Sequence, residues 1–316
     1  MDTNNKVVLG GASSATVTAG TTASATVNLV EGVSDYDSLQ KAVGNGGTVN
    51  ILKSIDVPSS LTVGTNVTIQ AAYQDVTLKN ISSGNLFIVD TNGTLTIGGG
   101  VHTITLDGNQ VASSIIKIDA GTATLASNGI IKGANTSGVV LSQLKYGTFN
   151  MTGGEIRSNT GTNGGGVAVQ SGTFSMTGGS IEGNSAGTNG GGVFMSGGTF
   201  SMTGGSIEGN SAKANGNGVR MSNGIFQMSG SAVIDSNNDV YLNSGKQITI
   251  TGEITAEVET VATITPSEYA ENAVLANGTD DNLGLVTEVG KFAVTPNPAD
   301  GSEWTIDTEG KLQQVQ

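Results

Sequence analysis

The sequence predicts an all-β fold, a right-handed parallel β-helix with three short strands in each coil of about 25 residues. Three observations predict it. A glycine-flanked motif recurs at a nearly constant spacing, short runs of alternating apolar residues accompany each copy, and Gly- and Asn-rich corners separate the runs. A fixed period of about 20 to 50 residues is typical of solenoids, in which each unit covers only its neighbours.

The repeated motif reads Gly-Thr-Phe-Ser/Asn-Met-Thr-Gly-Gly, and a diverged copy follows the three clear ones. Its phenylalanines are Phe149, Phe174, Phe200 and Phe226, with spacings of 25, 26 and 26 residues. Because neighbouring strands lie about 4.8 Å apart, we expect these rings to stack in one column inside the coil. The methionines two residues later share that face, namely Met151, Met176, Met202 and Met228.

Two further runs complete each unit, at residues 180–182 and 193–195 in the second copy. Alternation over about three residues indicates strands, not a helix. The inward residues of the second strand are Ile156, Ile181 and Ile207, followed by either Val233 or Ile234. Those of the third strand are Val167, Val169, Val193, Met195, Val219, Met221, Val240 and Leu242. We expect all of these side chains in the core.

Asparagines mark one corner of the repeats, at Asn159, Asn184 and Asn210. Stacked amides pass hydrogen bonds from coil to coil, and Asn tolerates left-handed backbone. In the fourth copy the strict spacing reaches Ser236, whereas one inserted residue brings Asn237 to the corner. A corner ladder is the favoured interpretation, and a polar binding strip is the alternative.

The chain divides by composition into four segments. We expect a Thr/Ala/Gly-rich leader or strand arm at 1–32, a capping helix at 33–47, the parallel β-helix at 48–258 and a C-terminal β cap or subdomain at 259–316. The helix has Ser34 or Asp35 as its N-cap and Gly44 as a stop signal. The arm is either a flexible leader or a strand donated to another subunit. The β-helix accounts for eight to nine coils.

Charge and cysteine content exclude several functions. The net charge is −13 and there are only two arginines, so we expect no nucleic-acid partner and no docking on anionic lipid. No apolar run approaches the roughly 18 residues of a membrane-spanning helix, so we expect no membrane insertion. The absence of cysteine removes disulfides and thiol chemistry. No signal peptide opens the sequence, which leaves the route of export open.

An outward column of charged residues runs along the second strands. Glu182 and Glu208 occupy equivalent positions in successive coils, with Arg157 before them and Asp235 after them. At about 5 Å, the two glutamates have the separation of a retaining glycosidase pair, and they are also weak candidates for a Ca²⁺ site. The third interpretation is that repetition of the unit copied a surface glutamate, and this one we favour. We therefore predict no catalytic residues and no cofactor.

The outward column of the third strands is a candidate binding strip. It contains Phe194, Arg220 and Tyr241 in successive coils. Two exposed aromatic rings beside a guanidinium suit contact with a carbohydrate or a protein. The Gly-Gly-Gly corners are not phosphate loops, because no helix follows them.

The repeat also carries a family resemblance. The run Gly-Gly-Thr-Phe-Ser-Met-Thr-Gly-Gly-Ser-Ile-Glu-Gly-Asn-Ser-Ala at residues 197–212 resembles the coils of bacterial surface and secreted proteins with a pectate-lyase-like right-handed β-helix. It is similar to repeat-rich segments of adhesins and autotransporter passengers. The resemblance implies an extracellular or bacterial cell-surface location. It assigns no functional residue, because this fold hosts lyases, hydrolases, adhesins and fibres.

Two classes of function follow as hypotheses. The first is a non-enzymatic extracellular structural and adhesive protein, which presents a rigid wall or forms a filament through the N-terminal arm or by end-to-end stacking. Its partners would be further copies of the chain, or a glycan or protein of a host or cell surface. The alternative is a carbohydrate-binding module, or a polysaccharide lyase or glycoside hydrolase, that uses the same wall.

Overall fold

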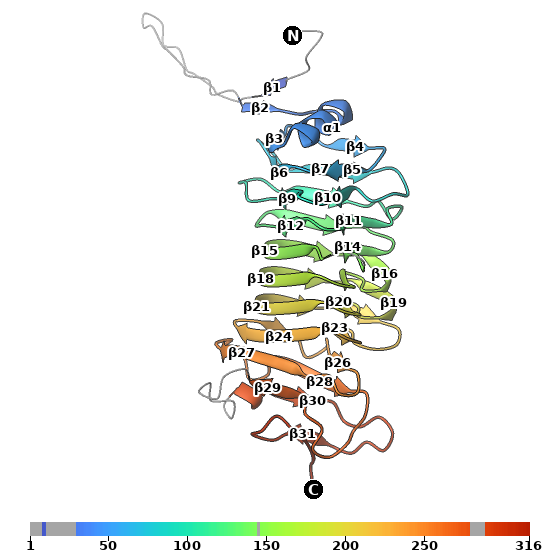
Figure 1. Ribbon diagram of the computed structural model, residues 1–316, viewed down its shortest axis with the longest axis vertical. Helices are drawn as coiled ribbons and strands as arrows, with labels where there is room; N and C mark the ends of the chain where they lie inside the picture. Colours follow the sequence, from blue (N-terminus) through green and yellow to red (C-terminus); the bar gives the residue numbers. More distant parts are fainter. Residues whose placement is uncertain (1–7, 11–29, 144–145, 279–287) are drawn as a thin grey trace, which may run out of the picture.

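The computed structural model is a parallel β-solenoid of about nine turns, with about 26 residues per turn. It describes residues 8–10, 30–143, 146–278 and 288–316. The coils stack along one axis, from helix α1 at one end to strand β31 at the other (Figure 1). The predicted fold class is therefore confirmed.

The first two strands of each coil contribute to one sheet of 15 strands, which we call the long sheet. Its strands are β3 (Gly47–Ile51), β4 (Ile55–Val57), β6 (Asn66–Ala71), β7 (Val76–Asn80), β9 (Thr94–Ile97), β10 (Ile104–Asp107), β12 (Thr122–Leu125), β13 (Gly129–Lys132), β15 (Thr148–Arg157), β18 (Thr173–Glu182), β21 (Thr199–Glu208), β24 (Ile225–Gly230), β25 (Val233–Ile234), β27 (Ile248–Ile254) and β29 (Ala276–Gly278).

The third strand of each coil joins a parallel sheet of ten strands, the ten-stranded sheet. Its members are β5 (Leu61–Val63), β8 (Phe87–Val89), β11 (Ser114–Ile118), β14 (Ser137–Leu141), β17 (Val167–Val169), β20 (Val193–Met195), β23 (Val219–Met221), β26 (Val240–Leu242), β28 (Ala262–Pro266) and β30 (Phe292–Val294).

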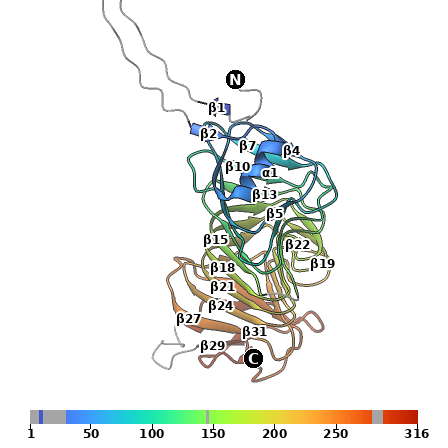
Figure 2. The ribbon, with the colours of Figure 1, turned by 45° about the horizontal axis from the view of Figure 1, so that its top comes forward.

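A smaller sheet forms in the connection between the second and third strands of three central coils. This three-stranded sheet consists of β16 (Thr160–Asn163), β19 (Ser185–Asn189) and β22 (Ser211–Ala212). Figure 2 shows β19 and β22 on the opposite side of the coil from β15, β18 and β21.

Helix α1 (Tyr36–Asn45) covers the first coil, and Leu39 and Val43 are its buried residues. Asp35 is the N-cap, because its Oδ1 accepts a hydrogen bond from Ser38 N at 2.9 Å. The helix ends at Asn45, where Gly46 adopts a φ of +80° and its N–H returns to Ala42 O.

At the N-terminal side, β1 (Val8–Gly10) pairs antiparallel with β2 (Val30–Gly32) of the same chain. Residues 1–7 and 11–29 of the predicted arm lie outside the described residues. At the other end, β28 and β30 extend the ten-stranded sheet and β29 extends the long sheet. Position 258 therefore marks no break in either sheet. The antiparallel pair β31 (Trp304–Ile306) and β32 (Leu312–Gln314) follows.

The core is built from columns of identical residues, as the repeat predicts. The four phenylalanines pair in register across β15, β18, β21 and β24, and all are fully buried. Their successive ring centroids lie 5.2, 4.5 and 4.8 Å apart. The methionine column and the walls of the second and third strands are buried as expected. In the fourth copy Ile234 occupies the second wall, and Val233 is only partly buried.

In three coils the first and second strands are continuous, where the sequence suggested two separate runs. In β18 the pairing shifts between Met176 and Ser180, across Gly178 and Gly179. Gly179 has a φ of +85°, and a Cβ there would lie 2.6 Å from Gly154 O. The Gly-Gly pair therefore allows the strand to bend without ending.

The asparagine ladder is present, but its fourth member is Asn238, not Ser236 or Asn237. Nδ2 of Asn159, Asn184 and Asn210 each donates to Oδ1 of the next member, at 3.0, 3.0 and 3.1 Å. Ser236 and Asn237 are exposed, because the fourth corner is a turn in which Asn238 N donates to Asp235 O at 2.7 Å. That turn makes the last step 28 residues long.

No helix among the described residues has the length and apolar character needed to cross a bilayer.

The stacked rings yield a stability prediction. Replacement of Phe200 by alanine should lower the free energy of unfolding by about 3–5 kcal/mol, since it leaves a cavity between two other phenylalanines. Chemical denaturation measures this. Ser201→Ala, one residue along and facing outward, is the matched control and should change the free energy by less than about 0.5 kcal/mol. Equal losses for the two variants would contradict the stacked core.

Candidate functional site

A groove of about 700 Å³ lies beside β26 and β28, near the C-terminal end of the ten-stranded sheet. Two loops form its walls, at residues 214–217 and 295–299. Its aromatic, amide and acidic lining includes Asn215, Asn217, Asp239, Tyr241, Tyr269 and Asn297.

The groove forms because the fourth repeat has a shorter connection than the second and third. Val193 follows Ile181 by 12 residues, and Val219 follows Ile207 by 12, which leaves room for β19 and β22. Val240 follows Ile234 by only six residues. The three-stranded sheet therefore ends at β22. Tyr241 and the loop that follows β22 both line the groove.

A short hydrogen-bond relay fixes the wall under β22. Asn217 Oδ1 accepts from Ala212 N at 2.9 Å, and Asn217 N donates to Asp239 Oδ1 at 2.7 Å. The Ala212 N–H at the edge of the sheet is thus already bonded to a side chain. This arrangement protects the edge against pairing with another strand and favours a small ligand over an added strand.

Tyr269 stands on the opposite wall and is held at both its ring and its hydroxyl. Its hydroxyl lies 2.7 Å from Thr295 Oγ1 and donates to Pro296 O at 3.2 Å. Its ring packs at 5.8 Å from the ring of Trp304, at an interplanar angle of 56°. Burial raises the pKa of the Tyr269 phenol, the Thr295 hydrogen bond opposes that rise, and Asp239 adds to it.

The structure brings Phe194, Arg220 and Tyr241 together in adjacent strands. Phe194 pairs with Arg220, and Arg220 with Tyr241, whose ring centroid lies 4.3 Å from Arg220 Cζ. Of the three, Tyr241 lines the groove. Phe194 and Tyr241 are half-buried, not fully exposed as the sequence suggested. The Gly190 corner approaches Phe194 closely, since a Cβ at Gly190 would lie 2.8 Å from Phe194 Cβ.

Arg220 is partly desolvated in this stack. Burial lowers its pKa, and the nearby Tyr241 opposes that shift. Nε and Nη1 are buried and have no hydrogen-bond partner within the described part of the chain. The face of the Tyr241 ring supplies a cation–π contact instead. Arg220 thereby packs against one face of the Tyr241 ring.

Sequence reasoning found Tyr241 but missed Asp239 and Tyr269. The shortened connection before Val240 was a readable signal for an uncovered Tyr241 and for the neighbouring Asp239. Tyr269 lies beyond the last clear repeat, so no periodicity indicated which way its ring points.

Glu182 and Glu208 are stacked in register on the long sheet, away from the groove. Arg157 Nε lies 2.8 Å from Glu155 Oε2 in its own strand, and Glu208 Oε1 accepts from Ser206 Oγ at 3.2 Å. Within the described ranges, no group of three or more His, Cys, Asp or Glu side chains could hold a metal ion. The Ca²⁺ site at these glutamates stays a prediction.

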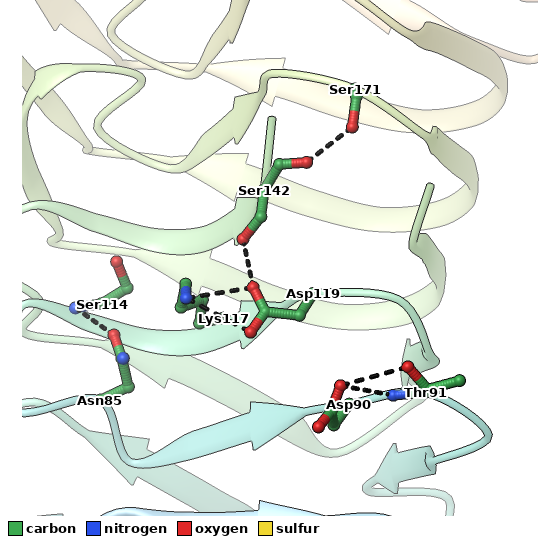
Figure 3. Close-up of polar contacts among 8 residues, drawn as sticks. All are labelled: Asn85, Asp90, Thr91, Ser114, Lys117, Asp119, Ser142 and Ser171. Carbon is green, nitrogen blue, oxygen red and sulfur yellow. Dashed lines mark hydrogen bonds and ion pairs between the residues drawn. The ribbon is translucent and has the colours of Figure 1, made fainter. Parts of the chain in front are cut away.

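A second pair of carboxylates, Asp90 and Asp119, was not singled out by the sequence. They follow strands β8 and β11 of the ten-stranded sheet, in successive coils (Figure 3). Asp119 contacts Lys117 Nζ at 3.0 Å and accepts from Ser142 Oγ at 2.7 Å. Asp90 accepts from Thr91 N at 2.7 Å. The Lys117 and Thr91 contacts hold the carboxylates within their own coils, and the Ser142 contact joins Asp119 to the next coil, which indicates a structural role.

Comparisons of the chain with models of protein families, with curated proteins and with solved structures found no match. The class that the structure defines is that of the fold, a parallel β-solenoid.

The raised pKa of Tyr269 predicts a loss of stability at alkaline pH. The folded-state pKa of Tyr269 lies above the unfolded value of about 10. The contribution of this phenol to the free energy of unfolding is therefore complete below about pH 10 and is lost as pH rises through the folded-state pKa. The free energy of unfolding of the unmodified chain should therefore fall more steeply above about pH 10 than that of Tyr269→Phe. Urea denaturation over this range measures the difference. If the free energy of unfolding fell equally with pH in the two proteins, the raised pKa of Tyr269 would be contradicted.

Proposed function

We propose that the chain is a non-enzymatic extracellular or cell-surface protein with a structural and adhesive role, in which the solenoid is a rigid rod and the groove binds a glycan. The observation that carries the proposal is the lining of the groove. Two tyrosine rings, several amides and one carboxylate converge there on a rigid sheet.

This set of side chains matches the chemistry of a sugar. A pyranose ring has C–H-rich faces, which stack on an aromatic ring, and hydroxyls around its edge, which both donate and accept hydrogen bonds. Tyrosine supplies an apolar face with a polar tip. The Asn215 and Asn297 amides each offer donors and an acceptor. Pro266, Pro298 and Ala299 add apolar contacts beside these polar groups, and a small number of placed polar groups fixes the orientation of a ligand in such sites.

Binding is better supported than catalysis. A glycoside hydrolase uses two carboxylates, and Asp239 is the only carboxylate among the described residues that line the groove. Its Oδ1 is already engaged with Asn217 N. A polysaccharide lyase needs a base beside a cation, and the described lining contains no Lys, Arg or His. The lyase or hydrolase therefore remains the weaker candidate.

An adhesive role suits the position of the groove on the rod. The groove lies at β26 and β28, toward the end opposite helix α1 (Figure 1). A rod attached by its other end would present the groove away from its anchor. The surface location also draws on the similarity of the repeats to those of bacterial surface proteins.

Removal of the Tyr241 ring tests the site. Tyr241→Ala should weaken binding to any glycan that the protein recognises by roughly tenfold or more, since the lost apolar contact is worth about 1.5–3 kcal/mol. Isothermal titration calorimetry with oligosaccharides selected from an array measures it.

Two variants serve as controls for this test. Tyr241→Phe keeps the ring and should keep affinity within about threefold. Tyr146→Ala removes a tyrosine that is 87% exposed and not part of the groove, and it should leave the glycan affinity unchanged. Unchanged affinity in Tyr241→Ala, or an equal loss in Tyr146→Ala, would count against the groove.

A further inference from the structure

We propose that the groove selects sugars that are uncharged or carry an amine, and rejects sugars that carry a carboxylate. This inference rests on the proposed function and adds the charge class of the ligand.

The groove is negatively charged at neutral pH. Asp239 is the one charged side chain among its described lining residues. Lys213, which precedes Ala214, and Asp235, which precedes Ser236, flank the lining with opposite charges. Two more carboxylates flank it in sequence, because Glu268 lies between Ser267 and Tyr269 and Asp300 follows Ala299. Both are exposed. Hydrogen bonds from Ser302 lower the pKa of Asp300, so it is ionised at neutral pH.

Asp239 is positioned to receive a donor from the ligand. The Asn217 N–H binds Oδ1 and thereby fixes the orientation of the carboxylate in the wall. An ionised carboxylate accepts several hydrogen bonds through its two oxygens. Oδ2 is thus the acceptor for a sugar hydroxyl or, with added charge attraction, for a sugar ammonium group.

Arg220 is the cation next to Tyr241, and it does not reverse this preference. Its guanidinium contacts the Tyr241 ring, and its Nε and Nη1 are fully buried. Burial of those two atoms leaves only Nη2 for a ligand carboxylate and excludes the paired contact that a guanidinium usually makes with one. A ligand carboxylate would instead meet Asp239 with like charge, which at about 4 Å lowers affinity roughly fivefold even in water.

Matched oligosaccharides test the inference on the full-length chain. The probes are β-1,4-linked tetramers of glucose, glucosamine and glucuronate, with galactose and galacturonate tetramers as a second matched pair. We expect each uronate to bind at least about fivefold more weakly than its neutral counterpart, and the glucosamine tetramer to bind more tightly than the glucose tetramer.

Asp239→Asn is the decisive variant, because it removes the charge but keeps an oxygen for the Asn217 N–H. It should weaken binding of the glucosamine tetramer roughly fivefold more than binding of the glucose tetramer, because only the ammonium group loses a charge attraction, and it should reduce discrimination against glucuronate. Glu182→Gln removes one negative charge from the long sheet, away from the groove, and should change none of these affinities.

The outcomes separate the two proposals. Uronates bound as tightly as neutral sugars, or a glucosamine affinity that Asp239→Asn does not alter, would overturn the charge selectivity while the glycan-binding groove stands. No binding by any of the five tetramers at millimolar concentration would overturn both.

Discussion

The alignment of each coil with the next is the constraint on which the whole structure depends. A period of 25 or 26 residues places like residues on adjacent parallel strands, so that Phe174 and Phe200 stack at 4.5 Å and Asn184 bonds Asn210 at 3.0 Å. Because side chains alternate between faces, a slip of one residue would turn the phenylalanine column outward. The buried amides add a second penalty for a slip, since an unpaired buried amide costs about 1–3 kcal/mol.

The same constraint explains how much of the fold could be predicted. The columns headed by Phe149 and Ile156 follow from counting, because burial repeats wherever the unit repeats. The exchange of Asn237 for Asn238 shows where counting stops. A corner can contain extra residues in a turn while the strands on either side keep their positions. The repeat sequence does not indicate at which corner position the extra residues are inserted.

The candidate site arises where the repetition weakens. Tyr241 was predicted on an outward position, but the groove beside it depends on a missing strand after β22 and on chain segments near Thr295 that belong to no repeat. A site of this kind is built from the difference between coils, so periodicity indicates its location only through the shortened connection. By contrast, Glu182 and Glu208 are copies within the repeat, and among the described residues they belong to no group of three or more His, Cys, Asp or Glu side chains that could hold a metal ion.

Thermal unfolding of two deletion variants tests the central claim that coils are interchangeable units in a fixed register. Removal of residues 173–198 takes out one full period and joins Gly172 to Thr199, so every remaining strand keeps an in-register neighbour. Removal of residues 173–185 takes out half a period and misaligns the strands that follow. We predict a cooperative transition and an intact β-sheet circular dichroism spectrum for the first variant, and loss of both for the second. If the variant that lacks residues 173–198 were unfolded while the variant that lacks residues 173–185 stayed folded, the account would be contradicted.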